Sequence, residues 1–347
     1  MQDYYQLDAE GEDLLSRHAD WWQRRGMLYV EARSGPLGDL WLPLSDGTVA
    51  TEDTDVTPDM LDVDRAVGPA LEPGPLERNG DHFATTAPYG RIPWTEALLG
   101  TPIHATIQGG SMRTKAFISD WAEWEAETEH RHEGWMDLLI RLTELLVERT
   151  NGRRAPVHTL LRGPADLAEA VVGPELMSYS LYDHPDELRR FLDVATEVFI
   201  QALHAQLDRF PRLRGGYVNP FGIWAPGKVV RTQCDATAFL SPNQYAEWFL
   251  PYDVRICETV DCSMIHLHSC SLHTVPKLLE VERPHAIQIT LESEPSGPPL
   301  PAMIPIFQDI LAVKPLLVDG PLTADEVKHL QDVLPTDGLS IRRRIES

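Results

Sequence analysis

Long apolar runs, cysteines and export signals are scarce or missing in this chain of 347 residues. No apolar run reaches the roughly 20 residues that span a membrane. The first residues, Met1-Gln2-Asp3, lack the basic and then apolar pattern of a signal peptide. Four cysteines in so long a chain do not form a disulfide framework. These absences predict a cytoplasmic protein that does not bind membranes.

Positive charge is also in deficit, because Lys and Arg number 30 against 53 Asp and Glu, giving a formal net charge of −23. Such a chain repels phosphate backbones, so nucleic acid is not an expected partner. The Gly-Gly pairs at 109–110 and 215–216 lack the spacing of a dinucleotide-binding fingerprint. Hydrophobic residues make up 43% of the chain, which is enough for a globular core.

Apolar segments typical of β-strands alternate with helical patterns along most of the chain. Eight of them lie near residues 28, 104, 158, 216, 265, 287, 316 and 340. Alternation alone also fits a doubly wound open sheet, but the count of eight favours an α/β fold of the closed (β/α)8 TIM-barrel type. We expect residues 1–26 to form an N-terminal helical arm and residues 27–347 to form the barrel, with a long loop after the first strand.

The stretch from Met264 to Cys270 carries the strongest chemical signal. Side chains alternate between the faces of a β-strand, so Met264, His266, His268 and Cys270 share one face if the whole stretch is a strand. Two imidazoles and a thiol in phase form a set of soft metal ligands. A buried strand with satisfied histidines and an inert cysteine explains the pattern about equally well.

Barrel active sites lie at the carboxyl ends of the strands, where the chain delivers several other polar or aromatic groups. A solvated loop position is the ordinary interpretation of any one of them. As a set, we interpret Asp235, Arg162 and Gln108 as catalytic or substrate-orienting residues, and Arg33, Tyr217, Trp224 and His266 as substrate-binding residues. Glu292 ends the strand after the histidines, within about 5–10 Å of them. His268, Cys270 and Glu292 are therefore the predicted zinc ligands.

Several strings resemble one known superfamily, that of uroporphyrinogen decarboxylase, the corrinoid-linked methyltransferases and cobalamin-independent methionine synthase. The strings run from about residue 92 to 345 and are Ile92-Pro93-Trp94-Thr95-Glu96-Ala97-Leu98-Leu99-Gly100, Gly163-Pro164-Ala165-Asp166-Leu167-Ala168, Asp235-Ala236-Thr237-Ala238, Leu240-Ser241-Pro242, Leu250-Pro251-Tyr252 and Leu267-His268-Ser269-Cys270. The resemblance implies a (β/α)8 barrel.

In the methyltransferase branches of this superfamily, a His-x-Cys pair on the fifth strand binds zinc, and His268 and Cys270 match it. Glu292 matches the carboxylate ligand of the methionine synthase branch. Asp337 stands where the superfamily has a further cysteine ligand, and this oxygen donor makes the ion more Lewis acidic. The resemblance also implies a corrinoid protein or a folate as methyl carrier, a small-molecule substrate and a homodimer.

The decarboxylase branch fits less well, because its first strand is Arg-rich whereas this chain has Glu31-Ala32-Arg33 there. The first functional hypothesis is therefore a zinc-dependent methyltransferase acting between a small methylated substrate and a thiol or a corrinoid or folate carrier. The second is a metal-free decarboxylase or lyase of a small carboxylate or tetrapyrrole-like substrate, with Arg33 or Arg162 binding the carboxylate. The third is a non-catalytic protein that binds a corrinoid or another small molecule.

Overall fold

The computed structural model describes residues 4–34, 38–127, 134–292 and 296–346. Its centre is a six-stranded parallel sheet in the order β1-β15-β14-β13-β12-β11. The strands are β1 (Leu28–Ser34), β11 (Val229–Gln233), β12 (Cys262–His268), β13 (Ala286–Thr290), β14 (Leu316–Gly320) and β15 (Leu339–Glu346). The first and last strands of the chain are therefore neighbours in the sheet, and the predicted α/β class is confirmed.

Short segments lie between the two edge strands of this sheet, β1 and β11. On the β1 side, the Asp81 amide donates to the Tyr29 carbonyl over 3.0 Å. Next come β4 (His82–Phe83) and β5 (Thr85–Thr86), and β5 pairs in parallel with β8 (Ala155–Pro156). On the β11 side, the Arg231 amide donates to Nε2 of His158 over 3.0 Å. Eight segments thus follow one another around a barrel-like ring.

Gly163 permits the closest approach in this ring. A Cβ atom added at Gly163 would lie 2.2 Å from the carbonyl oxygen of Gln233, far inside van der Waals contact. Glycine therefore allows the irregular segment after β8 to lie directly against β11.

Two of the predicted barrel strands are wrong. The strand near residue 104 is β6 (Ile103–Thr106), which belongs to an antiparallel sheet with β2 (Thr54–Val56) and β7 (Ser111–Thr114). The strand near residue 216 is the two-residue β9 (Tyr217–Val218), which forms a hairpin with β10 (Trp224–Ala225). Residues 82–86 and β11 take their places in the ring.

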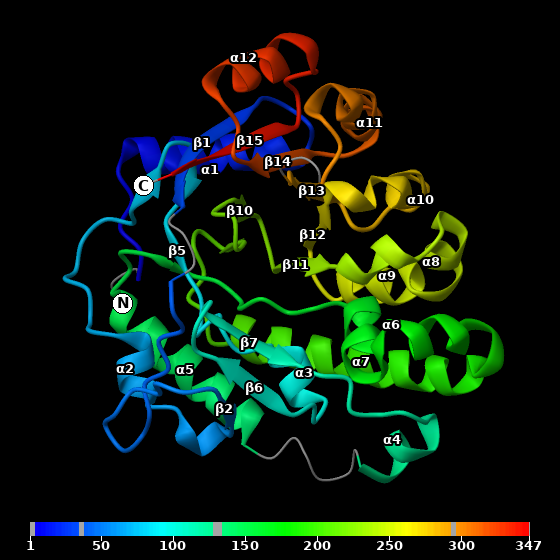
Figure 1. Ribbon diagram of the computed structural model, residues 1–347. Coiled ribbons are helices and arrows are strands. Elements are labelled where there is room, and N and C mark those ends of the chain that lie inside the picture. The colour runs from blue at the N-terminus through cyan, green and yellow to red at the C-terminus, as the bar shows by residue number, and fades with distance from the viewer. Residues whose placement is uncertain (1–3, 35–37, 128–133, 293–295, 347) are drawn as a thin grey trace.

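Helices cover the outer face of the central sheet, and Figure 1 shows α12, α11, α10, α9 and α7 in succession outside strands β15 to β11. The helices are α1 (Ala9–Trp22), α2 (Val63–Val67), α3 (Trp94–Leu98), α4 (Trp121–Glu127), α5 (Trp135–Thr150), α6 (Pro164–Asp183), α7 (Pro185–Leu207), α8 (Pro242–Trp248), α9 (Leu250–Glu258), α10 (Val275–Leu279), α11 (Leu300–Val313) and α12 (Ala324–Val333). Shorter elements are η1 (Pro58–Met60), η2 (Asp235–Phe239), η3 (Ser269–Thr274) and β3 (Arg78–Asn79). In the described part of the chain, no helix has the length and apolar character to cross a membrane.

The two faces of β12 show how side chains divide between the layers. Ile265 and Leu267 belong to the large core between the sheet and its helices, whereas Met264 packs in a small separate cluster with Trp21 and Leu28. That cluster lies inside the ring at the amino-terminal ends of the strands. Helix α1 therefore closes this end, and polar side chains of the inner face gather toward the other.

Candidate metal centre

Strand β12 places both histidines on the inner face, as the alternation predicted. His266 pairs in register with Gln288 of β13, and His268 pairs with Thr290. The imidazole rings are nearly perpendicular, at 82°, with centroids 4.8 Å apart. Their Nε2 atoms therefore point toward a common place at the carboxyl-terminal end of the ring.

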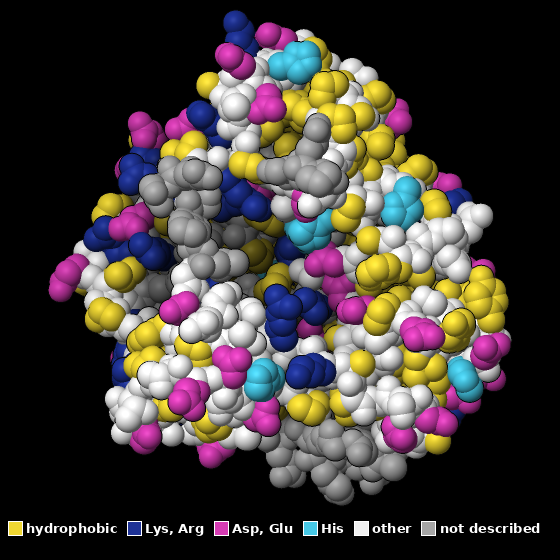
Figure 2. Space-filling model, viewed as in Figure 1, with side chains coloured by type: hydrophobic (Ala, Val, Ile, Leu, Met, Phe, Trp, Pro, Cys, Tyr) yellow, Lys and Arg dark blue, Asp and Glu magenta, His cyan; other side chains and the backbone are white. Residues whose placement is uncertain are grey.

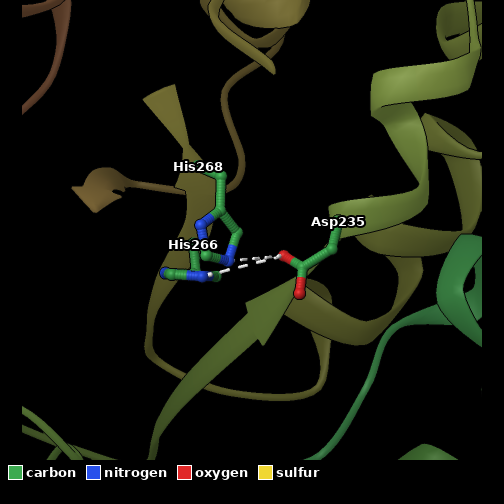
Figure 3. Close-up of side chains that lie close together, drawn as sticks. All are labelled: Asp235, His266 and His268. Carbon is green, nitrogen blue, oxygen red and sulfur yellow. Dashed lines mark ion pairs between the residues drawn. The ribbon is translucent and has the colours of Figure 1, made fainter. Parts of the chain in front are cut away.

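Asp235 meets the two histidines from the neighbouring strand. It begins η2, directly after β11, and its Oδ1 atom lies 3.7 Å from Nε2 of His266 and 3.7 Å from Nε2 of His268. Figure 3 shows the two histidines of β12 and Asp235 of η2 converging. One ligand atom from each lies within 4.8 Å of the others. This spacing suits three ligands of one metal ion, whose bonds to nitrogen and oxygen are about 2 Å long.

The hydrogen bonds of the histidines determine which nitrogen carries the proton. Nδ1 of His268 contacts the carboxylate of Glu292, which only accepts when ionised. Nδ1 of His266 contacts Oε1 of Gln288, whose Nε2 donates to Thr290 Oγ1 over 3.0 Å. Both rings therefore place a proton on Nδ1, so the Nε2 atom of each neutral ring presents a lone pair to Asp235. This is the outer arrangement typical of metal-binding histidines.

The carboxylate oxygen that faces the two lone pairs has no hydrogen bond. Oδ1 of Asp235 is a buried atom without a donor among the described residues. Burying an unpaired carboxylate oxygen costs free energy, and two acceptor nitrogens beside it make the local electrostatic potential still more negative. A cation satisfies all three groups at once, so the donor set fits a divalent metal ion such as Zn²⁺.

The charge states of the surrounding groups agree with this assignment. Burial, with help from the Arg231 guanidinium, lowers the pKa of His266 well below its usual value and keeps its lone pair free. Although burial raises the pKa of Glu292, hydrogen bonds from Ser269 and His268 bring it below the usual value. Glu292 is therefore ionised at neutral pH and orients His268 rather than lying among the three inner ligands.

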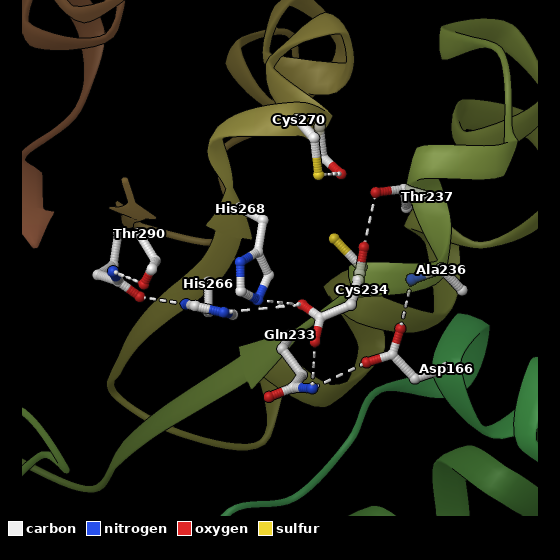
Figure 4. A network of polar contacts seen from close by, with 12 residues as sticks. Asp166, Gln233, Cys234, Ala236, Thr237, His266, His268, Cys270 and Thr290 are labelled. Carbon is white, nitrogen blue, oxygen red and sulfur yellow. Dashed lines mark hydrogen bonds and ion pairs between the residues drawn. The ribbon is translucent and has the colours of Figure 1, made fainter. Parts of the chain in front are cut away.

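A second polar network holds Asp235 in place. Nε2 of Gln233 donates to Oδ2 of Asp235 and to Oδ2 of Asp166, both over 3.0 Å. Oδ1 of Asp166 accepts from the amide of Ala236 over 2.8 Å. Figure 4 shows this chain of contacts running from Asp166 through Gln233 toward the histidines. Burial and the neighbouring Asp235 raise the pKa of Asp166 to about 7.

Two predicted zinc ligands lie apart from this group. Strand β12 ends at His268 and continues as the 3₁₀ turn η3, so Cys270 leaves the inner face; it is exposed, and its Sγ lies 3.9 Å from Ser271 Oγ. Figure 4 shows it away from His266 and His268. Asp337 precedes β15, at the amino-terminal end of the sheet, where its Oδ1 accepts from the Gly26 amide over 2.8 Å. The structure thus brings together His268 and Glu292 of the predicted set, but not Cys270 or Asp337.

Arg162 lies beside the site, and Arg33 is on β1. Nη1 of Arg162 pairs with the fully buried Glu96 over 3.1 Å, and its guanidinium faces a cavity of about 490 Å³ also lined by Arg113 and Glu169. Arg33 is exposed near the carboxyl-terminal end of its strand.

Gln108, Tyr217 and Trp224 lie away from the site because the strands that were to deliver them are not barrel strands. Gln108 is exposed in the turn between β6 and β7. Tyr217 is buried in the β9–β10 hairpin, and Trp224 donates from Nε1 to the Leu213 carbonyl over 2.8 Å. Their substrate or catalytic roles are therefore not supported by position.

Sequence reasoning singled out Asp235 as a catalytic residue but did not place it with the histidines, and it missed Gln288 as a histidine partner. The signal for Asp235 was weak because β11 reads Val-Val-Arg-Thr-Gln, and its two polar inner positions conceal the strand. Gln288 lies mid-strand in register with His266, which is visible only once the neighbours of β12 are known.

The comparisons with known proteins agree with the fold. The sequence model of the uroporphyrinogen decarboxylase (URO-D) family matches residues 95–210, about a third of the chain. No curated protein sequence matches. A methyltransferase from Methanosarcina mazei has a similar structure, with a TM-score of 0.53 and 15% identity over 75% of this chain and 74% of that chain. The resemblance to the uroporphyrinogen decarboxylase superfamily is thereby confirmed.

A second solved structure shows a lower similarity. It is a B12-independent methionine synthase from Shewanella sp. W3-18-1 in complex with selenomethionine, with a TM-score of 0.37 and 13% identity. The match covers 59% of this chain and 58% of that one. Identities this low describe the fold alone, so the chemistry of this chain has to be inferred from its own site.

Proposed function

We propose that this protein is a metal-dependent, methyltransferase-like enzyme that acts on a small molecule at the carboxyl-terminal end of the barrel. In this proposal Asp235, His266 and His268 hold a zinc ion, and a substrate atom takes the remaining position. The observation that carries it is the convergence of two histidine Nε2 atoms on an unpaired carboxylate oxygen. The predicted ligand set with Cys270 and Asp337 is replaced by this one.

The chain's own groups have distinct tasks in this proposal. Glu292 and Gln288 hold the histidine rings and their tautomers, and Gln233 orients Asp235. A zinc ion in an open site lowers the pKa of a thiol or water bound to it. Nitrogen and oxygen ligands are harder donors than thiolates. A zinc ion in this site would therefore be more Lewis acidic than a zinc ion in a site with cysteine ligands. A corrinoid protein or a folate would deliver the methyl group from the open side.

Zinc binding tests the proposal directly. The purified protein is loaded with Zn²⁺, dialysed against metal-free buffer and analysed for metal content. We expect about one zinc ion per chain, and we expect it to be lost in His268→Ala and Asp235→Asn. His104→Ala is the matched control, since His104 also contacts a carboxylate, Asp55, but in the outer sheet. Absence of bound zinc in the unchanged protein, or equal zinc in all four proteins, would refute the proposed centre.

A metal-free lyase is the second candidate, and the state of Asp166 favours it. A pKa near 7 lets this carboxyl group give or take a proton at neutral pH, and Gln233 links it to Asp235. Turnover of a small carboxylate that persists after zinc removal, and that is lost in Asp166→Asn, would select this candidate over methyl transfer.

A further inference from the structure

We propose that Arg231 and Arg344 form a carboxylate-binding subsite inside the barrel, beside the three proposed metal ligands, which holds the acidic group of a small substrate. The role of the bound carboxylate as substrate rests on the proposed function, but its binding does not require a metal ion. The subsite lies on strands β11 and β15, away from Arg33 and Arg162, the arginines that the sequence suggested.

Arg231 is the first half of the subsite. Its side chain is more than nine-tenths buried, with 6% of the residue exposed. Nη1 donates to Oε1 of Gln233, and the guanidinium carbon lies 5.9 Å from the ring centre of Phe221. Arg231 forms no ion pair among the described residues. Burial lowers its pKa to about 10, so it stays charged at neutral pH. The carboxylates of Asp235, Asp166 and Asp319 act on its charge without forming an ion pair, and Nη1 donates only to an amide oxygen, so a bound carboxylate could still pair with this guanidinium.

Arg344 is the second half and shares the carboxylate of Asp319 with Arg342. Nε and Nη2 of Arg344 bind both oxygens of Asp319 over 2.9 and 2.6 Å, and Arg342 binds the same carboxylate over 3.0 Å. One carboxylate therefore forms ion pairs with two arginines, and Glu292 is the other carboxylate that acts on Arg344. About a third of the Arg344 side chain is exposed, whereas Asp319 is 1% exposed. The exposed part of the guanidinium is thus available to a ligand.

Register and hydrogen bonds place both halves near the histidines, although Arg231 itself pairs with Met264, one inner-face position before His266. His268 pairs with Thr290, Thr290 pairs with Asp319, and Asp319 pairs with Arg342, so these four side chains share one face of the sheet. Nη2 of Arg344 lies 3.5 Å from Thr290 Oγ1. On the other side of His268, Arg231 is joined through Gln233 to Asp235. The two arginines therefore approach the proposed metal centre from opposite sides.

Arginines gather in this interior although the chain as a whole is acidic. The formal net charge is −23, and Figure 2 shows Lys and Arg side chains together with Asp, Glu and His side chains around the hollowed centre of the visible face. A guanidinium presents two parallel donors that match the two oxygens of a carboxylate, which makes this the ligand group of best fit. A carboxylate here would place the rest of a small substrate within reach of the histidines.

Anion titration of metal-depleted protein tests the subsite. Protein passed over a chelating resin is titrated with sodium acetate, and binding is followed by calorimetry and by the rise in unfolding temperature. Sodium chloride at equal ionic strength and sodium phosphate are the comparison salts. We expect saturable acetate binding, weakened at least tenfold in Arg231→Gln and in Arg344→Gln. Arg209→Gln, which removes an arginine paired with Glu144 on the outer surface, should bind acetate normally.

Three results of the acetate titration would count against the subsite. Unsaturable acetate binding, phosphate binding tighter than acetate, or equal loss in Arg209→Gln would overturn it. Where Arg231→Gln fails to fold, Arg344→Gln decides alone, because Arg342 remains to pair with Asp319. Zinc binding is measured separately, so acetate binding without zinc would support the subsite while refuting the metal centre, and the converse result would do the opposite.

Discussion

At the scale of single residues, metal binding at the proposed site depends on which histidine nitrogens carry a proton. Each histidine donates from Nδ1 to a fixed acceptor, which leaves Nε2 as the acceptor nitrogen of the neutral ring. Glu292 is the stronger of the two partners because it is charged and is itself held by the amide of Ser269 over 2.9 Å. The affinity for metal should therefore respond to a residue that need not touch the ion.

Replacing Glu292 by Ala tests this outer contact. His268 would lose its acceptor, and its ring would be free to rotate or to adopt the other tautomer. We expect zinc affinity to fall by about 10- to 100-fold, the usual effect of losing such a partner. Competition with a chromogenic chelator measures the change. Glu326→Ala, which removes a capping carboxylate in α12, should leave zinc affinity unchanged, and equal losses in both variants would contradict the assigned contact.

Asp253 gives the protein a pH-dependent stability. Burial raises the pKa of this carboxyl group from 3.8 to about 8, although it accepts a hydrogen bond from the Tyr245 hydroxyl over 2.8 Å. The folded state therefore keeps a proton that the unfolded state releases above pH 3.8. The contribution of Asp253 to the free energy of unfolding therefore falls as the pH rises from 3.8 to about 8, and it changes little above about 8.

Asp253→Asn should remove that dependence, because the amide oxygen can still accept from Tyr245 and carries no charge. We expect the variant to gain on the order of 2 kcal/mol over the unchanged protein at pH 8, and little at pH 4. Urea unfolding at the two values measures the difference. Asp193→Asn, at an exposed ion pair with Arg255, is the control and should show no such trend. A gain that does not grow with pH would contradict the raised pKa.

At the scale of elements, the end of β12 decides which groups face the centre. A strand continued to Cys270 would keep its thiol in line with the histidines, but the chain turns into η3 after His268. We expect Cys270→Ala to keep its full zinc content, with His268→Ala as the depleted comparison. Loss of zinc in Cys270→Ala, measured by metal analysis, would restore the thiol as a ligand.

Elements with strong periodicity were predictable from the sequence. Strands β1, β12, β13, β14 and β15 and the long helix α7 follow clear apolar patterns, and their order gave the right fold class. The missed strands are β5, which has two residues, and β11, which carries polar residues on its inner face. Their places in the sheet become clear only when the whole ring of strands is known. The histidines of the site were predictable because they alternate within a strand. Asp235 became a ligand candidate only when η2 was placed against β12.

At the scale of the whole molecule, helix α1 is an integral part of the barrel. Trp21 is fully buried and packs with Leu28, Met264 and Leu317 across the amino-terminal end of the ring. Trp21→Ala should cost about 3–5 kcal/mol of stability, because truncating a buried tryptophan leaves a large cavity. Denaturant unfolding measures this loss. Trp41→Ala, at a tryptophan that is 48% exposed, should cost far less, and similar losses in both would contradict the role of α1.

Closure of one end by α1 makes the interior a cup rather than a tunnel. A molecule that reaches the histidines has to enter and leave by the same rim. A second reactant that enters and a first product that leaves would then use the same opening. In the proposed methyl transfer, the small substrate and the methyl carrier would therefore both approach the histidines from this one side.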